Sequence, residues 1–274
     1  MTIAIIGVGL IGGSIGLAAR ARGVGRVVAC DARSGVADEA VHIGAADSAA
    51  ESFPEAVAQA DLVILATPPA QIIELLPELA RHLSPVAIAT DVGSVKQPIA
   101  EAARTILPER FVPSHPMAGR EVHGLGAAQA TLFEGATWAV TPLETSELSA
   151  IEQVTAFVES LGARSLQLTP ERHDSIVAVT SHGPHVLAYA LYALARERAI
   201  NEPELFALAA GGFHSTTRVA ASAPALWTQI CLANREPVIE VLRTLQGRVD
   251  SAIAALEAGD EATLNTLFTQ GHRD

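Results

Sequence analysis

The stretch Thr2-Ile3-Ala4-Ile5-Ile6-Gly7-Val8-Gly9-Leu10-Ile11-Gly12-Gly13-Ser14 decides the fold of this 274-residue chain. Its first five residues form a short apolar run rich in β-branched side chains, which is typical of a buried strand. An Ala/Leu-rich run from Ser14 to Arg22 follows and predicts a helix. A G-x-G-x-x-G motif between a strand and a helix indicates a Rossmann-type α/β domain that binds a dinucleotide.

Each glycine of this motif has a physical task. Gly7 allows the tight turn, Gly9 lets a pyrophosphate approach the backbone, and Gly12 lets the helix pack closely on the strand. The anion then lies at the N-terminus of the helix, where the backbone N–H groups point at it. We therefore expect cofactor contacts from this loop at Gly7, Gly9, Leu10, Ile11 and Gly12.

The choice of nucleotide depends on Asp31. The run Arg26 to Cys30 predicts the second strand, and it ends at Asp31, about twenty residues after the glycines. A carboxylate there accepts hydrogen bonds from the adenosine ribose and repels a 2′-phosphate, so NAD is favoured. Arg33 could instead bind that phosphate, which leaves NADP use open. A nucleotide-free α/β domain is the structural alternative.

The strand and helix alternation continues and places polar residues after two further strands. The run 61–66 predicts a strand that ends at Thr67 and Pro68, a turn that would pass beneath the cofactor, and 71–82 predicts a helix. The run 86–90 predicts another strand, closed by a segment that contains Gly93 and Ser94. The Ser94 hydroxyl could touch nicotinamide or substrate, or it could cap the next helix. Lys96 could support the site or be an ordinary helix-start lysine.

His115 is the candidate catalytic residue. It follows the apolar run Phe111-Val112-Pro113, so we expect it at the carboxyl end of a strand, where open α/β sheets place their chemistry. A histidine has a pKa near neutrality and can accept a proton at pH 7. The alternative is a capping histidine in a surface loop.

The pattern changes near residue 168. The runs 136–142 and 165–168 predict strands on either side of a helix at 146–161. From Thr169 onward, where Thr169 suits a helix N-cap and Pro170 the first helical position, only helical patterns occur. We expect a Rossmann-type domain at 1–168 and an all-helical domain at 169–274, with the active site in the cleft between them.

The helical half holds further polar candidates. Ser181 and His185 share a helix face, and Gly183-Pro184 should kink the helix between them. His182 and His185 could bind a metal, but no third ligand with helical spacing accompanies them, so we expect no metal. Arg218 stands among small uncharged residues and could pair with a substrate carboxylate or with an acid of the protein.

Composition excludes several classes of protein. A net charge of −12 without a basic cluster argues against nucleic-acid binding. The uncharged run 175–195 could span a bilayer, but its central serine, histidines and proline are costly in lipid, so we expect a buried helix at a subunit interface. No basic segment precedes Ile3, which argues against a signal peptide. Two cysteines without metal-ligand spacing, Cys30 and Cys231, fit a reducing cytoplasm.

Five motifs, in this order, resemble those of the prephenate and arogenate dehydrogenases of tyrosine biosynthesis. The resemblance spans roughly residues 3 to 230. Only the glycine motif is shared widely among dehydrogenases, whereas the His-Pro and Arg motifs together are quite specific. The motifs are Gly7-x-Gly9-Leu10-Ile11-Gly12-Gly13-Ser14, Asp91-x-Gly93-Ser94-Val95-Lys96, Ser114-His115-Pro116-Met117-Ala118-Gly119-x-Glu121, Ser181-His182-x-Pro184-His185 and Thr217-Arg218-Val219-Ala220-x-Ser222.

The resemblance implies NAD-dependent oxidative decarboxylation of a cyclohexadienyl substrate by a homodimer joined through its helical domain. It implies that His115 accepts the hydrogen bond and proton of the substrate hydroxyl, with Ser94 bridging that hydroxyl and the nicotinamide side. It also implies that Arg218 binds a substrate carboxylate. Four further residues would line or gate the side-chain end of the substrate: His185, Ser181, Glu121 and Ser222.

The identity of the substrate stays open between prephenate, which carries a pyruvyl group, and arogenate, which carries an amino acid. Ser215 and Ala223 stand where relatives often carry acidic residues, and a missing acid favours the anionic keto substrate. Because the sequence given stops at Asp274, we expect little feedback by tyrosine through a separate domain. Two rivals are a β-hydroxy acid dehydrogenase, whose lysine base is missing after Lys96, and a nucleotide sensor without catalysis.

Overall fold

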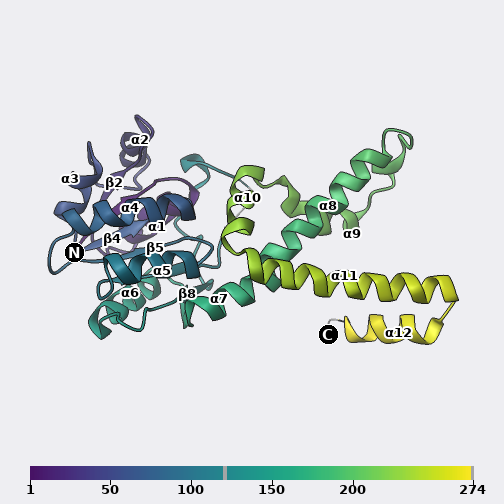
Figure 1. Ribbon diagram of the computed structural model, residues 1–274. Helices are drawn as coiled ribbons and strands as arrows, with labels where there is room; N and C mark the ends of the chain where they lie inside the picture. Colours follow the sequence, from purple (N-terminus) through teal and green to yellow (C-terminus); the bar gives the residue numbers. More distant parts are fainter. Residues whose placement is uncertain (120–121, 273–274) are drawn as a thin grey trace.

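A six-stranded parallel sheet forms the core of the N-terminal half (Figure 1). The structure, a computed structural model, describes residues 1–119 and 122–272. The strand order is β3-β2-β1-β4-β5-β6, so the order reverses between β1 and β4, the place where such sheets bind ligands. The strands are β1 (Thr2–Ile6), β2 (Arg26–Cys30), β3 (Ser48–Ala49), β4 (Leu62–Leu65), β5 (Ile88–Asp91) and β6 (Phe111–Val112).

Helices cover both faces of this sheet, as the near-continuous apolar runs of its strands require. Ile3 and Ile5 of β1 belong to the core beneath α1, α2 and α6, whereas Ala4 and Ile6 belong to the core beneath α3, α4 and α5. This alternation confirms the predicted α/β class. The helices are α1 (Leu10–Ala21), α2 (Val36–His42), α3 (Phe53–Ala58), α4 (Pro69–His82), α5 (Gln97–Ile106) and α6 (Leu148–Ser160).

The strands expected after residue 110 do not all extend this sheet. β7 (Ser114–Pro116), β8 (Thr137–Val140) and β9 (Arg164–Gln167) form a second sheet, in which β7 runs antiparallel to β8 and β9 parallel to it. The short 3₁₀ helix η1 (Leu125–Ala127) lies between β7 and β8. His115 therefore lies within a strand of its own, not at the end of β6 as predicted. Pro113 has no N–H with which to continue the β6 ladder, and the chain changes sheet there.

The first helix after β9 has the N-cap that was predicted, because the Thr169 hydroxyl accepts the Arg172 N–H. A π-helical turn, η2, then stands directly before Gly183, in the region where a kink was expected. The elements are α7 (Pro170–Val177), η2 (Ala178–His182), α8 (Gly183–Arg198), η3 (Leu205–Ala207), α9 (Gly211–Thr217), η4 (Arg218–Ala221), α10 (Pro224–Ala233), α11 (Arg235–Ala258) and α12 (Glu261–Gln270).

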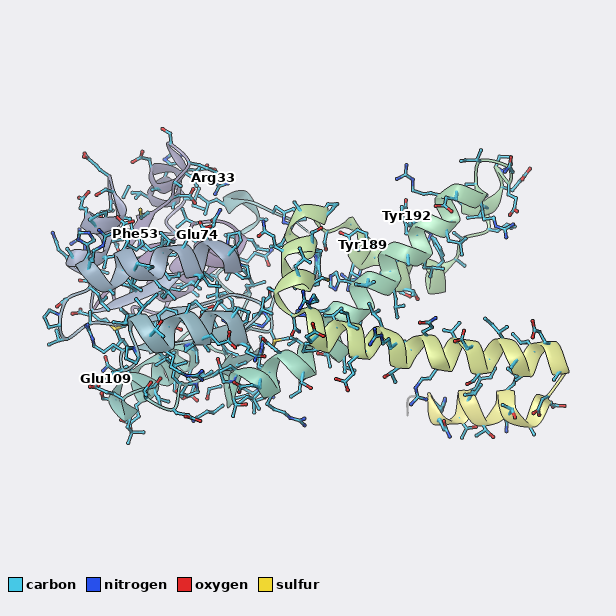
Figure 2. The ribbon with its side chains drawn as sticks, in the orientation of Figure 1. Arg33, Phe53, Glu74, Glu109, Tyr189 and Tyr192 are labelled. Atoms are coloured by element: carbon cyan, nitrogen blue, oxygen red, sulfur yellow. The ribbon has the colours of Figure 1, made fainter. Side chains whose placement is uncertain are left out.

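The helices α8 and α11 project away from the sheets, and α12 folds back along α11 (Figure 1). The run 175–195 was expected to be a buried helix, but within one chain α8 leaves Leu187, Leu191 and Leu194 exposed. Tyr189 and Tyr192 lie along the same helix (Figure 2). Such an apolar surface is typical of a protein interface. None of the helices among the described residues has the length and apolarity needed to cross a membrane.

Candidate active site

The glycine loop joins β1 to α1 and has the shape that a nucleotide phosphate requires. Gly7 has a φ of 93°, which disfavours any side chain. A Cβ on Gly12 would lie 2.0 Å from the Gly7 carbonyl oxygen, so only glycine lets the helix pack this close to the turn. A Cβ on Gly9 would meet nothing within 4 Å. The space beside Gly9 is therefore open, where a pyrophosphate would lie. Leu10 and Ile11 are the first residues of α1.

Thr67 and Pro68 follow β4 and stand beside this loop. The Thr67 methyl group would lie 2.9 Å from a Cβ on Gly7, so the two turns are in contact. Among the residues that the structure describes, the Thr67 hydroxyl is a buried oxygen without a hydrogen-bond partner. Buried hydroxyl groups normally have partners. An orphaned hydroxyl beside the strand-order reversal fits a site for a bound nucleotide.

Asp31 lies at the carboxyl end of β2 and is already held by several donors. The Val8 N–H donates to Oδ2 over 3.0 Å, and the Arg33 guanidinium donates to both carboxylate oxygens at 2.9 and 3.0 Å. Partial burial raises the pKa of Asp31, but the hydrogen bonds from Arg33 and Val8 outweigh it and hold the pKa below its ordinary value. Asp31 is thus a charged acceptor, and Arg33 is paired with it.

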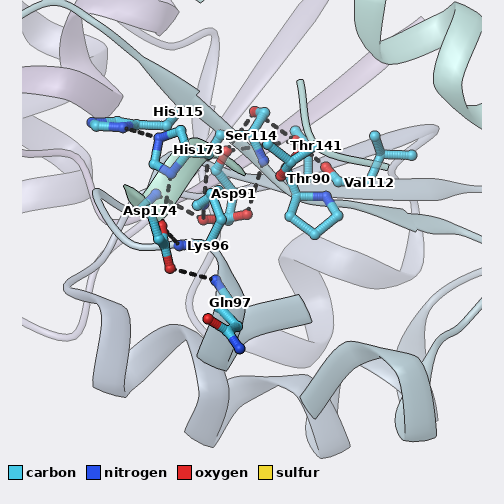
Figure 3. A network of polar contacts seen from close by, with 12 residues as sticks. Thr90, Asp91, Lys96, Gln97, Val112, Ser114, His115, Thr141, His173 and Asp174 are labelled. Atoms are coloured by element: carbon cyan, nitrogen blue, oxygen red, sulfur yellow. Dashed lines mark hydrogen bonds and ion pairs between the residues drawn. The ribbon is translucent and has the colours of Figure 1, made fainter. Parts of the chain in front are cut away.

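Asp91 and Lys96, at the end of β5, form a fully buried ion pair (Figure 3). Burial raises the pKa of Asp91 and lowers that of Lys96, and their attraction opposes both shifts. The N–H groups of Gly93 and Ser114 also donate to the Asp91 carboxylate, at 2.7 and 3.1 Å, which stabilises its charge. Lys96 Nζ donates in addition to the Ser114 carbonyl over 2.7 Å. Lys96 therefore supports the site and is not an exposed helix-start lysine.

The first turn of α5 is capped by a residue of the helical half. Asp174 of α7 accepts the Lys96 N–H at Oδ1 and the Gln97 N–H at Oδ2, both over 2.8 Å. A carboxylate at a helix N-terminus stabilises the unpaired N–H groups and the helix dipole. The alternative in which Ser94 caps this helix is wrong, because the N-cap is Lys96. Ser94 lies half-buried in the loop between β5 and α5.

His115 contacts the same network from β7. Its Nδ1 lies 2.9 Å from Nε2 of His173, and Nδ1 of His173 lies 2.7 Å from Oδ1 of Asp174. Burial lowers the pKa of His115 well below 6.5, and His173, Lys96 and His182 lower it further. The imidazole of His115 is therefore neutral at pH 7 and able to accept a proton.

The helical half contributes two more histidines to this region. His182 is buried, and its Nδ1 lies 3.0 Å from the Asn234 amide nitrogen. Burial lowers the pKa of His182 to about 4, against the attraction of Asp174. His185 stacks on Trp227 with ring centroids 3.3 Å apart, and its Nδ1 lies 2.8 Å from the Ser181 carbonyl oxygen. The rings of His185 and Trp227 line a cavity of about 350 Å³.

Arg218 lies in another part of the helical half. It lines a separate cavity of about 540 Å³ together with Tyr192 and His214. Ser222 lies near α8, where its carbonyl oxygen accepts the Tyr189 hydroxyl over 2.5 Å. The predicted nucleotide residues and Ser94 thus follow the carboxyl ends of strands of the parallel sheet, and His115 lies on the neighbouring strand β7. Arg218 lines its cavity beside Tyr192 of α8. Glu121, also predicted, is outside the described residues.

Sequence reasoning missed His173, Asp174, Asn234 and Trp227. An adjacent His-Asp pair in the first turns of a predicted helix is the one signal that pointed to this contact, and it is common on solvated helices. His115 and His173 come into contact only in the folded chain, since 58 residues separate them in the sequence. Across the described parts of the chain, no group of three or more His, Cys, Asp or Glu side chains could hold a metal ion.

Sequence comparison identifies the family. The model for "Prephenate dehydrogenase, nucleotide-binding domain" matches residues 15–167, and "Prephenate dehydrogenase, dimerization domain" matches 169–270. The chain belongs to the prephenate dehydrogenase family. It is 36% identical over 271 residues to the prephenate dehydrogenase of Bacillus subtilis, covering 97% of this chain and 73% of the relative. It is 36% identical over 244 residues to the cyclohexadienyl dehydrogenase of Zymomonas mobilis, covering 88% and 83%.

Solved structures agree with this assignment. Prephenate dehydrogenase from A. aeolicus in complex with hydroxyphenyl propionate and NAD⁺ superposes with a TM-score of 0.92 at 30% identity, covering 98% of this chain and 95% of the other. Arogenate dehydrogenase from Synechocystis superposes with a TM-score of 0.84 at 30% identity, covering 98% and 97%. Family membership confirms the predicted fold class, the oxidoreductase class and the nucleotide cofactor.

The glycine loop of this prephenate dehydrogenase family member gives a matched pair of variants. Gly12→Ala should lower the stability of the protein by about 1–3 kcal/mol or more, because its Cβ overlaps the Gly7 carbonyl. Gly9→Ala should unfold at the wild-type temperature but bind NAD more weakly, because its Cβ occupies only the open space. Thermal unfolding and calorimetric titration with NAD measure the two effects. Equal loss of stability in both variants would contradict the open space beside Gly9, and wild-type NAD affinity in Gly9→Ala would contradict its assignment to the nucleotide.

The lowered pKa of His182 predicts an acid-sensitive fold. Between its ordinary pKa of 6.5 and the folded value of about 4, the unfolded chain binds more protons, so stability falls as the pH falls through this range. The shift corresponds to roughly 3 kcal/mol. His182→Gln should make the unfolding free energy depend less steeply on pH between 6.5 and 4 in urea titrations. The exposed control His82→Gln should keep the wild-type slope. An unchanged slope in His182→Gln would refute the attribution of this pH dependence to His182.

Proposed function

We propose that this protein catalyses the NAD-dependent oxidative decarboxylation of prephenate to 4-hydroxyphenylpyruvate. The observation that carries the proposal is His115, a half-buried and neutral imidazole beside the carboxyl edge of the sheet in a member of this family. A neutral imidazole can accept the proton of the substrate hydroxyl at pH 7. A nucleotide sensor has no proton to move, and the β-hydroxy acid dehydrogenase alternative calls for a lysine base in the helical half, where the sequence has no lysine.

The chemistry requires a base and a fixed geometry. When bound, NAD supplies the acceptor for the hydride that leaves the hydroxyl-bearing ring carbon. The bond to the ring carboxylate breaks, carbon dioxide leaves, and the electron pair of that bond completes the aromatic ring. As hydride leaves, the hydroxyl becomes acidic, and His115 holds its proton. We assign to Ser94 the hydrogen bond between that hydroxyl and the nicotinamide side.

We infer NAD rather than NADP from the charge at Asp31. Its carboxylate would accept hydrogen bonds from the ribose hydroxyl groups and repel a 2′-phosphate. Arg33 does not offer a free cation to that phosphate, because its guanidinium pairs with Asp31 over 2.9 and 3.0 Å. Gly7, Gly9, Leu10, Ile11 and Gly12 would hold the pyrophosphate, with Thr67, Pro68 and Gly93 beside the rest of the cofactor.

We assign the substrate's carboxylates to the helical half. Arg218 would bind one carboxylate through its planar guanidinium. His185, Ser181, Ser222 and Glu121 would line or gate the side-chain end. Arogenate is the alternative substrate, since a cyclohexadienyl and an arogenate dehydrogenase are among the relatives. The uncharged Ser215 and Ala223 support the keto acid, because arogenate adds an ammonium group that an acid would recognise.

The proposal includes a homodimer of two-domain chains, divided into 1–168 and 169–274, in the cytoplasm. The exposed apolar residues of α8 and the family's dimerization domain at 169–270 support the dimer. Two cysteines that are both free support a reducing compartment.

The test is a steady-state assay of NADH formation with prephenate and arogenate offered separately, each with NAD and with NADP. We expect turnover with prephenate and NAD. Turnover with arogenate alone would keep the chemistry and change the side-chain contact. Activity with neither substrate would refute the proposed function.

The base assigned to His115 can be tested on the same assay. His115→Asn should lower kcat by about 10²–10⁴-fold, the usual effect of losing a general base. Because the pKa of His115 lies well below 6.5, kcat/KM of the wild type should stay level from pH 8 to pH 6.5 and decline only at lower pH. Near-wild-type turnover in His115→Asn would contradict the mechanism.

A further inference from the structure

Two buried residues behind His115 limit where its proton can lie. His173 and Asp174 are each 1% exposed, so their polar atoms have no access to bulk water. The rings of His115 and His173 meet edge to face, with centroids 5.1 Å apart and an interplanar angle of 70°. This arrangement lets a nitrogen of one ring point at a nitrogen of the other. Figure 3 shows the line of contacts from His115 through His173 to Asp174.

The Asp174 end of this line is a fixed acceptor. Its two oxygens accept the N–H groups of Lys96 and Gln97 at the start of α5, so the carboxylate cannot rotate away from His173. A carboxylate has no proton to give, so His173 Nδ1 must donate to it over 2.7 Å. In a neutral imidazole the other nitrogen then has no proton. His173 Nε2 is therefore an acceptor.

The same count of protons decides which ring nitrogen of His115 is protonated. Its Nδ1 lies 2.9 Å from the His173 acceptor and must carry the single proton of the neutral ring. Its Nε2 is then unprotonated, and the ring projects outward from the network (Figure 3). The other arrangement, with a proton on His173 Nε2, would place the proton of neutral His115 on Nε2 and remove its ability to accept.

We propose that His173 and Asp174 are positioning residues that fix the tautomer of His115 and so present its bare Nε2 to the substrate hydroxyl. This inference rests on the proposed function for its catalytic meaning. The other titratable groups that face His115 are Lys96 and His182. Neither competes for the His115 Nδ1 proton, because Lys96 donates to Asp91 and Ser114 and His182 Nδ1 pairs with Asn234.

The first experiment reads the tautomer directly and needs no substrate. In wild-type protein labelled with ¹⁵N-histidine, long-range nitrogen–proton correlation spectra at pH 7 distinguish protonated from bare ring nitrogens. The His115 signals are those lost in His115→Asn. We expect a protonated Nδ1 and a bare Nε2 in His115. A protonated Nε2 with a bare Nδ1 would overturn the proposal, whether or not the protein turns over prephenate.

The second experiment separates positioning from structural support. His173→Leu removes the acceptor at similar volume, whereas His173→Gln keeps an amide oxygen that can accept from His115 Nδ1. We expect His173→Leu to lower kcat by about 10²-fold or more with KM for prephenate little changed, since a general base in the wrong tautomer is ineffective. His173→Gln should recover most of that loss. The exposed control His82→Gln should match the wild type.

Equal losses of kcat in His173→Leu and His173→Gln would indicate structural support alone and overturn the proposal. A His173→Leu protein with wild-type kcat would do the same. If His173→Leu fails to fold, the spectrum of His173→Gln decides. A protonated His115 Nδ1 in that variant supports the positioning role of His173, and an unprotonated His115 Nδ1 refutes it. Absence of turnover in the wild type would refute the proposed function and leave the tautomer measurement unaffected.

Discussion

The buried ion pair between Asp91 and Lys96 is the interaction on which the rest of the site depends. Both side chains are fully buried, and Lys96 is the one lysine of the sequence. A buried charge without a partner is costly, so each residue commits the other to its position. Lys96 also donates to the Ser114 carbonyl, and Asp91 accepts the Ser114 N–H. The pair thereby fixes the start of β7, where His115 lies one residue further on.

The backbone at Lys96 also joins the two halves of the chain. Its N–H and that of Gln97 are capped by Asp174 of α7, which holds His173 against His115. The His115 imidazole is therefore held from one side by the end of the parallel sheet and from the other by the first helix of the helical half. The same buried polar residues thus connect the end of β5 and the start of β7 with the first turn of α5 and with α7.

The sequence predicted the features that local patterns determine. The glycine motif, the strand before it and the N-cap at Thr169 each depend on neighbouring residues, and the structure has them. The second sheet was not predicted, since the departure of β7 from β6 depends on hydrogen bonds between Ser114 and Asp91. His173 and Trp227 were missed because their contacts with His115 and His185 form only when distant segments pack together. The roles assigned to Arg218 and Glu121 remain predictions.

The measurement that tests this account most directly is the unfolding free energy, in urea, of Lys96→Met and of the double variant Asp91→Asn/Lys96→Met. Removing the ammonium alone strands a buried carboxylate and should cost about 3–5 kcal/mol, whereas replacing both charges should recover much of that loss. If the unfolding free energy of Lys96→Met lay within about 1 kcal/mol of the wild type, the central place of the ion pair would be contradicted, since a loss of that size is typical of a solvent-exposed ion pair.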